Sequence, residues 1–184
     1  MTVIKALLNE RNKIKTIYKD GIGRSFFTLR YILPLIAIFI LLILIESLNI
    51  KDKELTDLIS QINSLIGIIL GFSIASFAIF ISISNDKLGK ISKQTEYTYR
   101  EIGGALFFYN VEVSLFASLI GILLLHIDLP IINVSDLFTI ILSDDFSMSM
   151  LFNINIALFI IFLFLFFQLI FNLFYSSIFL HTKI

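Results

Sequence analysis

The sequence predicts an all-α integral membrane protein with four transmembrane helices, N- and C-termini in the cytoplasm, and a basic amphipathic helix before the first span. Two properties of the 184-residue chain indicate a membrane protein: 58% of its residues are hydrophobic and its mean hydropathy is +0.96. Both values lie well above those of a soluble domain of this size. A third property, the distribution of lysine and arginine between the apolar segments, indicates the orientation.

Four apolar windows have the length of a helix that crosses a bilayer. They cover residues 31–48, 65–83, 106–125 and 151–174. About thirty mostly polar and basic residues precede the first window, so we do not interpret it as a signal peptide and expect it to remain in the mature protein. We therefore expect a cytoplasmic segment, residues 1–30, followed by one transmembrane domain, residues 31–184.

The basic residues lie mainly on one side of these windows. Residues 1–30 contain seven, residues 84–105 contain four, and residues 126–150 contain none. Cytoplasmic loops of membrane proteins are enriched in lysine and arginine. With both termini inside, twelve of the fourteen basic residues are cytoplasmic, and we expect this orientation in a bacterial inner membrane.

The N-terminal segment has the pattern of a basic amphipathic helix at the cytoplasmic interface. Its apolar residues recur close to helical spacing: Val3, Ile4, Leu7, Leu8, Ile14, Ile17 and Tyr18. Basic residues occupy much of the remainder: Arg11, Lys13, Lys15 and Lys19. Two roles remain open, a topology anchor that contacts anionic headgroups and a docking surface for an anionic protein or nucleic acid.

Two spans carry rows of small residues at helical spacing, which permit close backbone approach between helices in lipid. The row on the second span comprises Ser64, Gly67, Gly71, Ala75, Ala78 and Ser82. The row on the third comprises Asn110, Ser114, Ala117 and Gly121. The two rows could face each other within one subunit. Alternatively, one of them joins subunits, and we expect a homo-oligomer, most simply a tetramer.

A second polar row on the second span, Ser73, Ser76 and Ser84, lies away from its glycines. Serine can bond its own helix backbone, so this row need not be wet. It nevertheless makes the second span the best candidate for a pore wall. Phe77 and Phe80, between the serines, are then candidates for an apolar constriction that closes by dewetting.

Glu112 is the costly charge within the third span, because an ionised carboxylate in hydrocarbon needs a partner, water or a proton. Arg30, at the cytoplasmic start of the first span, is the expected partner, reaching it by snorkelling. Interfacial solvation and a role in a pore or gate are the alternatives. In the fourth span, phenylalanines distributed around the helix suggest lipid contact, and Gln168, Asn172 and Ser176 form a polar row expected to bond a neighbouring helix.

Residues that carry chemistry are scarce. The chain has no cysteine and two histidines, His126 and His181, at opposite ends of the topology. Neither has a carboxylate at metal-ligand spacing, and no nucleotide-binding or nucleophile motif is present. We therefore expect no catalytic activity, no metal and no cofactor.

The run GFSIASFAIFISISNDKL, together with the basic N-terminal segment and the short first hairpin, resembles small membrane proteins of bacterial anti-phage defence systems. The membrane effector of Hailong systems and the membrane subunit of Kiwa systems fit in size and span number. The first resemblance implies a homo-oligomeric pore that disrupts the membrane potential under control of a cytoplasmic partner. The second implies a non-conducting sensor that recruits such a partner, encoded by a neighbouring gene.

A cluster of cations follows the second span directly, at Lys87, Lys90, Lys93 and Arg100. The positive-inside rule accounts for some of these charges. Alternatively, they bind an acidic partner protein or an oligonucleotide through phosphate contacts. A lysis protein or small toxin that acts without a partner is a further possibility.

Overall fold

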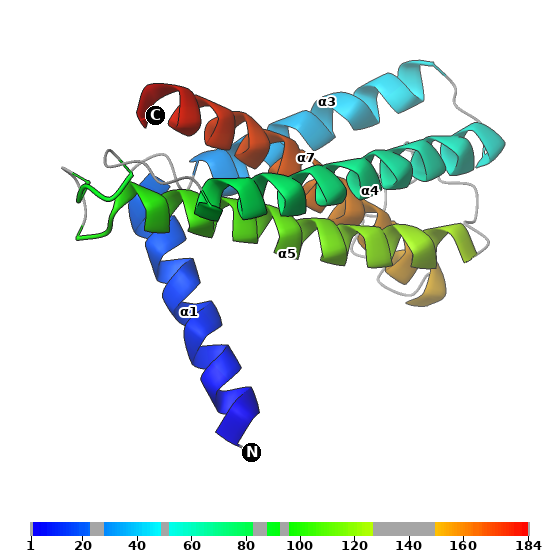
Figure 1. Cartoon of the computed structure of the whole chain (residues 1–184). Helices are drawn as coiled ribbons and strands as arrows, with labels where there is room; N and C mark the ends of the chain where they lie inside the picture. Colours follow the sequence, from blue (N-terminus) through cyan, green and yellow to red (C-terminus); the bar gives the residue numbers. More distant parts are fainter. Residues whose placement is uncertain are drawn as a thin grey trace.

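The computed structural model describes residues 2–22, 28–48, 52–82, 88–92, 96–126 and 150–183, and these are almost entirely helical (Figure 1). The elements are α1 (Thr2–Ile22), a π-helical turn η1 (Thr28–Ile32), α3 (Leu33–Ser47), α4 (Asp52–Ser82), α5 (Tyr99–His126) and α7 (Met150–Lys183). The turn η1 leads directly into α3, so the chain is continuously helical over residues 28–47.

Three helices of the described chain are long and apolar enough to cross a membrane. They are α4 over Lys53–Phe80, α5, and α7 over Ala157–Phe179. The apolar part of the first window, Arg30–Ile45, is shorter. The expected class, an all-α membrane protein, is thus in agreement with the structure. The number of spans and the orientation stay predictions.

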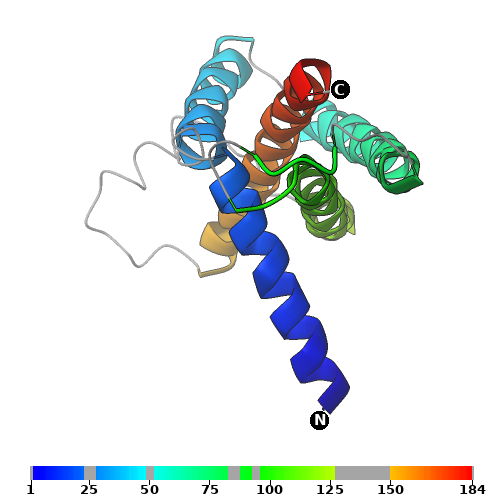
Figure 2. The same ribbon diagram turned by 60° about the vertical axis from the view of Figure 1, so that its left-hand side comes forward.

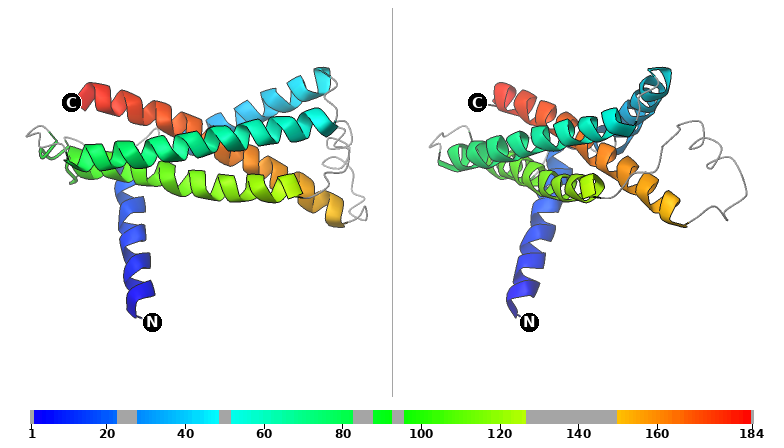
Figure 3. Two further views of the ribbon diagram at one scale, coloured as in Figure 1. Left: turned by 45° about the vertical axis from the view of Figure 1, so that its right-hand side comes forward. Right: turned by 90° about the vertical axis from the view of Figure 1, so that its right-hand side faces the viewer.

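The four helices after η1 alternate in direction along a common long axis (Figure 3). Helices α4 and α5 lie side by side, and α7 packs on both α5 and α3. Helix α1 is not aligned with the other helices. Its C-terminal half contacts α5, and its N-terminus points away from the other helices (Figures 1 and 2).

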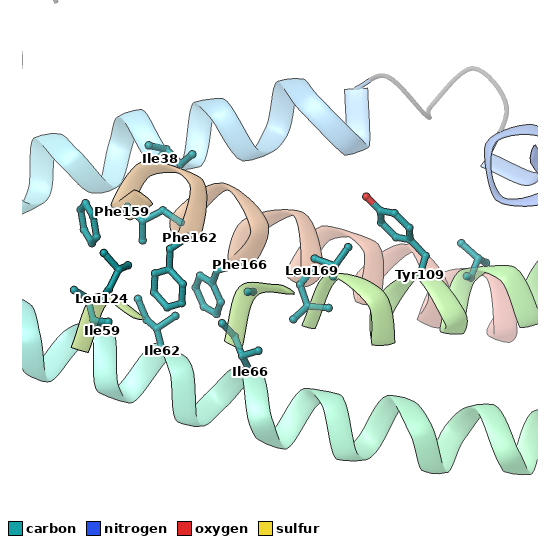
Figure 4. Close-up of a cluster of buried hydrophobic side chains, with 14 of the residues drawn as sticks. Ile38, Ile59, Ile62, Ile66, Tyr109, Leu124, Phe159, Phe162, Phe166 and Leu169 are labelled. Atoms are coloured by element: carbon teal, nitrogen blue, oxygen red, sulfur yellow. The ribbon is translucent and has the colours of Figure 1, made fainter. Parts of the chain in front are cut away.

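The hydrophobic core is built around α7, which lies between α3 and α5 (Figure 4). Phe159, Phe162 and Phe166 of α7 are buried. The expectation that phenylalanines on every side of this helix face lipid is therefore wrong for these three. The physical reason is that α7 has protein neighbours on more than one face, and large rings fill the space between them.

Residues 88–92 and 96–98 are the described part of the connection between α4 and α5. Ile91 and Thr98 form an antiparallel bridge, and Leu88 is fully buried against Phe80 and Phe107. Helix α5 then begins with a capping box: the Thr98 backbone N–H donates to Glu101 Oε2 at 2.9 Å, and the Glu101 N–H donates to Thr98 Oγ1 at 3.2 Å. The start of α5 is thereby fixed.

Candidate functional site

The candidate site is the junction at which α1 docks on the bundle. Tyr18 is only 2% exposed, and its ring stacks on Tyr109 of α5 with 4.2 Å between centroids. Three residues later, a Cβ atom added to Gly21 would lie 2.5 Å from Cγ2 of Ile102. The two helices approach closely here because residue 21 has no side chain.

A buried hydrogen-bond chain joins α1 to both α5 and α7. The Tyr18 hydroxyl donates to Asn172 Oδ1 at 2.7 Å, and Asn172 Nδ2 donates to Asn110 Oδ1. Burial raises the pKa of the Tyr18 phenol, so this hydroxyl stays protonated and remains a donor. A docked helix with such a bond in the interior is held in one register, because sliding leaves polar groups unpaired.

The polar row on α7 bonds its neighbours as expected for two of its three members. Gln168 Nε2 donates to the Arg30 carbonyl of η1 at 2.9 Å, and Asn172 bonds as described above. The hydroxyl of Ser176 instead donates to the Asn172 carbonyl of its own helix at 2.8 Å. Helix α7 therefore connects α1, η1 and α5.

Glu112 forms its ion pair with Arg11 of α1, not with the expected Arg30. The guanidinium of Arg30 lies over the Tyr109 ring, 5.0 Å from its centroid, in a cation–π arrangement. The expectation failed because it placed α1 at the membrane interface without contacts to the third span. In the structure α1 folds against α5 at the level of Glu112, so a helix outside the spans supplies the cation.

The small-residue row on α5 lies in the interior of the protomer. Asn110, Ser114, Ala117 and Gly121 are all buried. A Cβ atom on Gly121 would lie 2.6 Å from Asn63 Oδ1 and 2.8 Å from a ring carbon of Phe162. Both α4 and α7 therefore use this row for close approach.

The small-residue row on α4 has the opposite environment. All six of its members are exposed, namely Ser64, Gly67, Gly71, Ala75, Ala78 and Ser82. A Cβ atom on Gly67 or Gly71 would have no neighbour within 4 Å. The alternative in which the two rows face each other within one subunit is therefore wrong. Helix α4 packs on α5 through its larger residues instead.

The expected pore-wall residues lie mostly between α4 and α5. Ser73 is 0% and Phe80 3% exposed, Phe77 lies half-buried next to Gly104, and Ser76 is half-buried. Ser84 lies outside the described residues. The pore-wall interpretation of Ser73 and Phe80 is thus wrong for this structure, because this face of α4 is the one that binds α5.

Several buried polar atoms between these helices make no hydrogen bond within the described part of the chain. They are Ser73 Oγ, Ser114 Oγ, Asn110 Nδ2 and Asn63 Oδ1. The antiparallel pairing that sets Gly121 against Asn63 and Gly103 against Phe80 places Ser73 at about the level of Asn110.

Of the cations expected to bind a partner, Lys90 is exposed between α4 and α5, and Arg100 is exposed at the start of α5. Lys87 and Lys93 lie outside the described residues. The residue that sequence reasoning missed is Arg11. A signal for it was present, because Arg11, Ile14, Tyr18 and Gly21 follow at intervals of three, four and three residues and so share the helix face that docks.

The described residues contain no group of three or more histidine, aspartate or glutamate side chains that could hold a metal ion. Comparisons of the chain with models of protein families, with curated proteins and with solved structures found no match.

Proposed function

We propose that this chain is a homo-oligomeric four-span membrane subunit, with both termini cytoplasmic, that recruits a cytoplasmic partner and responds to it through α1. The observation that carries the proposal is the way α1 is attached. One helix, polar on much of its surface and outside the apolar windows, reaches into the bundle with Tyr18 and Arg11. A change at α1 therefore alters contacts of α5 and α7 directly.

The proposal that α3 is a fourth span is supported by its outer face, which carries a row of exposed large hydrophobic residues. They are Leu35, Ile36, Phe39, Ile40, Ile43 and Leu44. Such a face is stable next to lipid and costly next to water. With η1 included, the helical run of residues 28–47 has about the length needed to cross the hydrocarbon core.

The oligomer, which we propose to be a tetramer, forms through the exposed small-residue row on α4. A second copy of the chain is the natural occupant, because small residues in lipid stabilise contacts with other helices rather than with acyl chains. The serines do not oppose this. Ser64 and Ser82 donate to carbonyls of their own helix, at 2.9 and 2.8 Å.

The partner is proposed to be a cytoplasmic protein encoded by a neighbouring gene, as the resemblance to anti-phage defence proteins implies, or an oligonucleotide, as the cation cluster after the second span allows. The cations at Lys90 and Arg100 beside the bundle, and those of α1, give the cytoplasmic face its positive charge. Phosphates or carboxylates of the partner bind such a surface with an affinity that falls as salt rises. Replacing Lys87, Lys90 and Lys93 together by glutamate should abolish partner binding without changing the topology.

A gated pore is the second candidate function, in a form that differs from the sequence-based one. Its wall is the exposed small-residue row of α4, from Ser64 to Ser82, which exposed side chains such as Ile68 and Phe72 flank, rather than the row at Ser73. A membrane-potential dye separates the two candidates. Cells that express the chain with its neighbouring gene lose potential if it conducts, and keep it if it is a recruiting subunit.

The proposed response to the partner, a movement of α1 relative to α5 that we call the relay, is tested by a cysteine pair, Gly21→Cys with Ile102→Cys. The Cβ of residue 21 would lie 3.4 Å from that of Ile102, close to the ~3.8 Å typical of disulfides. Because the chain has no cysteine of its own, only this pair can cross-link within a protomer. We expect oxidation to close it in membranes, and purified partner to lower the yield at least twofold.

Each single-cysteine variant is the control for cross-links between protomers. A pair that fails to close without partner would refute the docked geometry. A pair that closes equally well with and without bound partner would refute the relay, while leaving recruitment to be judged from the pull-down.

A further inference from the structure

An open pocket of about 240 Å³ lies beside the docked part of α1, between that helix, η1, α5 and α7. Its polar end is lined by Arg11 and Lys15 of α1, Arg30 of η1, and Glu112 of α5. Three cations thus meet one carboxylate. The formal charge of this lining is positive even with the Arg11–Glu112 pair formed.

Geometry holds two of these cations in place. Arg11 is fixed by its pair with Glu112, and Arg30 by the rings of Tyr109 and Tyr31, whose centroids lie 5.0 and 5.6 Å from its guanidinium carbon. Lys15 forms no ion pair with any residue that the structure describes. Because three cations and one carboxylate line the same pocket, an anion bound there is attracted by the excess positive charge.

Apart from Tyr109 and Gln168, the remainder of the lining is apolar and follows α5 away from α1. Val113, Phe116 and Ile120 recur at one-turn intervals, and Leu165 of α7 lies opposite. From Glu112 to Ile120 this strip extends about 12 Å along the helix, at ~1.5 Å per residue. Phe116 remains 52% exposed, so the strip is open to the surrounding lipid.

We infer that this pocket binds one anionic phospholipid, with its phosphate between Lys15 and Arg30 and an acyl chain along Phe116 and Ile120. The inference rests on the proposed orientation, which puts α1 at the cytoplasmic interface and the apolar strip in the hydrocarbon layer. A positive end joined to an apolar strip matches the two ends of a lipid. A soluble phosphate compound contacts only the positive end, and a zwitterionic lipid brings a further cation to a lining that already has an excess of positive charge.

The bound lipid contacts both α1 and the bundle, so it contributes to docking. Its phosphate bridges Lys15 on α1 to Arg30 on η1, and it lies next to the Arg11–Glu112 pair. Anionic lipid therefore favours the docked position of α1. Membranes that lack it weaken this position, because the three cations then repel one another.

Native mass spectrometry of the whole protein, released from nanodiscs, tests the inference. We compare nanodiscs of phosphatidylcholine alone with nanodiscs that also contain phosphatidylglycerol. The expected result is one retained phosphatidylglycerol per protomer. Lys15→Gln should weaken its binding about fivefold, equivalent to ~1 kcal/mol, whereas Lys19→Gln, an exposed lysine one turn further along α1 that does not line the pocket, should leave binding unchanged.

A second pair of variants tests the acyl-chain strip. Ile120→Ser should weaken lipid retention, and Leu119→Ser, on an exposed neighbouring position, should not. Added inorganic phosphate should not displace the lipid or raise the thermal unfolding temperature. Equal loss in Lys15→Gln and Lys19→Gln would overturn the inference in favour of general interfacial attraction, and stabilisation by phosphate alone would overturn it in favour of a soluble anion.

The orientation is checked separately by labelling a single cysteine at position 9 with a membrane-impermeant maleimide in intact cells and in inverted vesicles. Labelling only in intact cells would refute the proposed function and this inference together. Cytoplasmic labelling without retained phosphatidylglycerol would refute the lipid site alone.

Discussion

Helices α4 and α5 lie side by side and each carries a row of small residues, yet one row is buried and the other faces outward. On α5, Gly121 lies under Asn63 and Phe162. On α4, Gly71 has no neighbour within 4 Å of where a Cβ would be. The difference shows that a row of small residues permits another helix to approach closely but does not cause it to do so. Whether a helix packs against the row depends on the large side chains nearby.

The largest effect is expected where a buried glycine is enlarged. Gly121→Leu inserts a side chain where even a Cβ atom would overlap Asn63 and Phe162, so we expect a loss of about 3 kcal/mol or more in stability. Thermal unfolding in a detergent that keeps the protein monomeric measures it. Gly67→Leu is the matched change on the exposed row, and this variant should unfold at the wild-type temperature. An equal loss of stability in the two variants would show that the two rows do not differ in environment.

The next effect concerns Asn110, the polar member of the buried row. Asn172→Leu removes its partner and that of the Tyr18 hydroxyl, leaving buried polar groups unpaired at a cost of about 2 kcal/mol. We expect α1 to be cleaved by protease much faster while the bundle stays intact. Tyr18→Phe removes one bond and keeps the stacked ring, so it should show a smaller acceleration. Protection as in wild type would mean that this chain of bonds does not hold α1.

A smaller and more selective effect is expected on the exposed row. Gly71→Leu should leave the protomer as stable as wild type but weaken self-association about tenfold, equivalent to ~1.4 kcal/mol. Assembly size in nanodiscs or mild detergent provides the measurement. Ile74→Leu, an exposed conservative change on the same helix, is the control. A variant that retains the wild-type assembly size would remove α4 from the proposed interface.

The smallest effect is expected at Ser73, which lies on the face between the two helices. Its buried hydroxyl makes no hydrogen bond in the described structure, so Ser73→Ala removes an unpaired polar group and should change stability by less than ~1 kcal/mol, in the stabilising direction. Conductance, if the assembly has any, should not change. A leak or block in this variant would restore Ser73 to a pore wall.

Much of the helical fold could be predicted from the sequence because length and apolar content decide whether a segment can cross lipid. Length and apolar content could not predict which face of each helix contacts protein and which contacts lipid. Lipid-facing and protein-facing side chains are equally apolar in a membrane, so hydropathy did not separate exposed Ile74 from buried Ile66. The helix α4 also begins at Asp52, well before the predicted span at residue 65, because polar residues extend a helix beyond the hydrocarbon layer.

The contacts at the junction of α1 with the bundle could be predicted only in part. The contacts that sequence did not predict join residues far apart in the chain. The polar row on α7 identified Gln168 and Asn172 as bonding residues before their partners were known. Glu112 was recognised as needing a cation, but Arg11 lies 101 residues away in sequence. The spacing of the docking face on α1 indicated that this helix packs on something, but its contacts with Tyr109 and Ile102 of α5 are tertiary.

The free end of α1 has a geometric consequence for the membrane itself. The helix has 21 residues and is therefore about 32 Å long. Its contacts with the bundle include Arg11, Tyr18 and Gly21, and its first half, residues 2–10, points away from the other helices (Figure 2). In the proposed orientation the first half lies among headgroups of one leaflet and adds area there, while the other leaflet gains none. Each copy thus acts as a wedge, and a cluster of copies would curve the bilayer so that it bulges toward the cytoplasm.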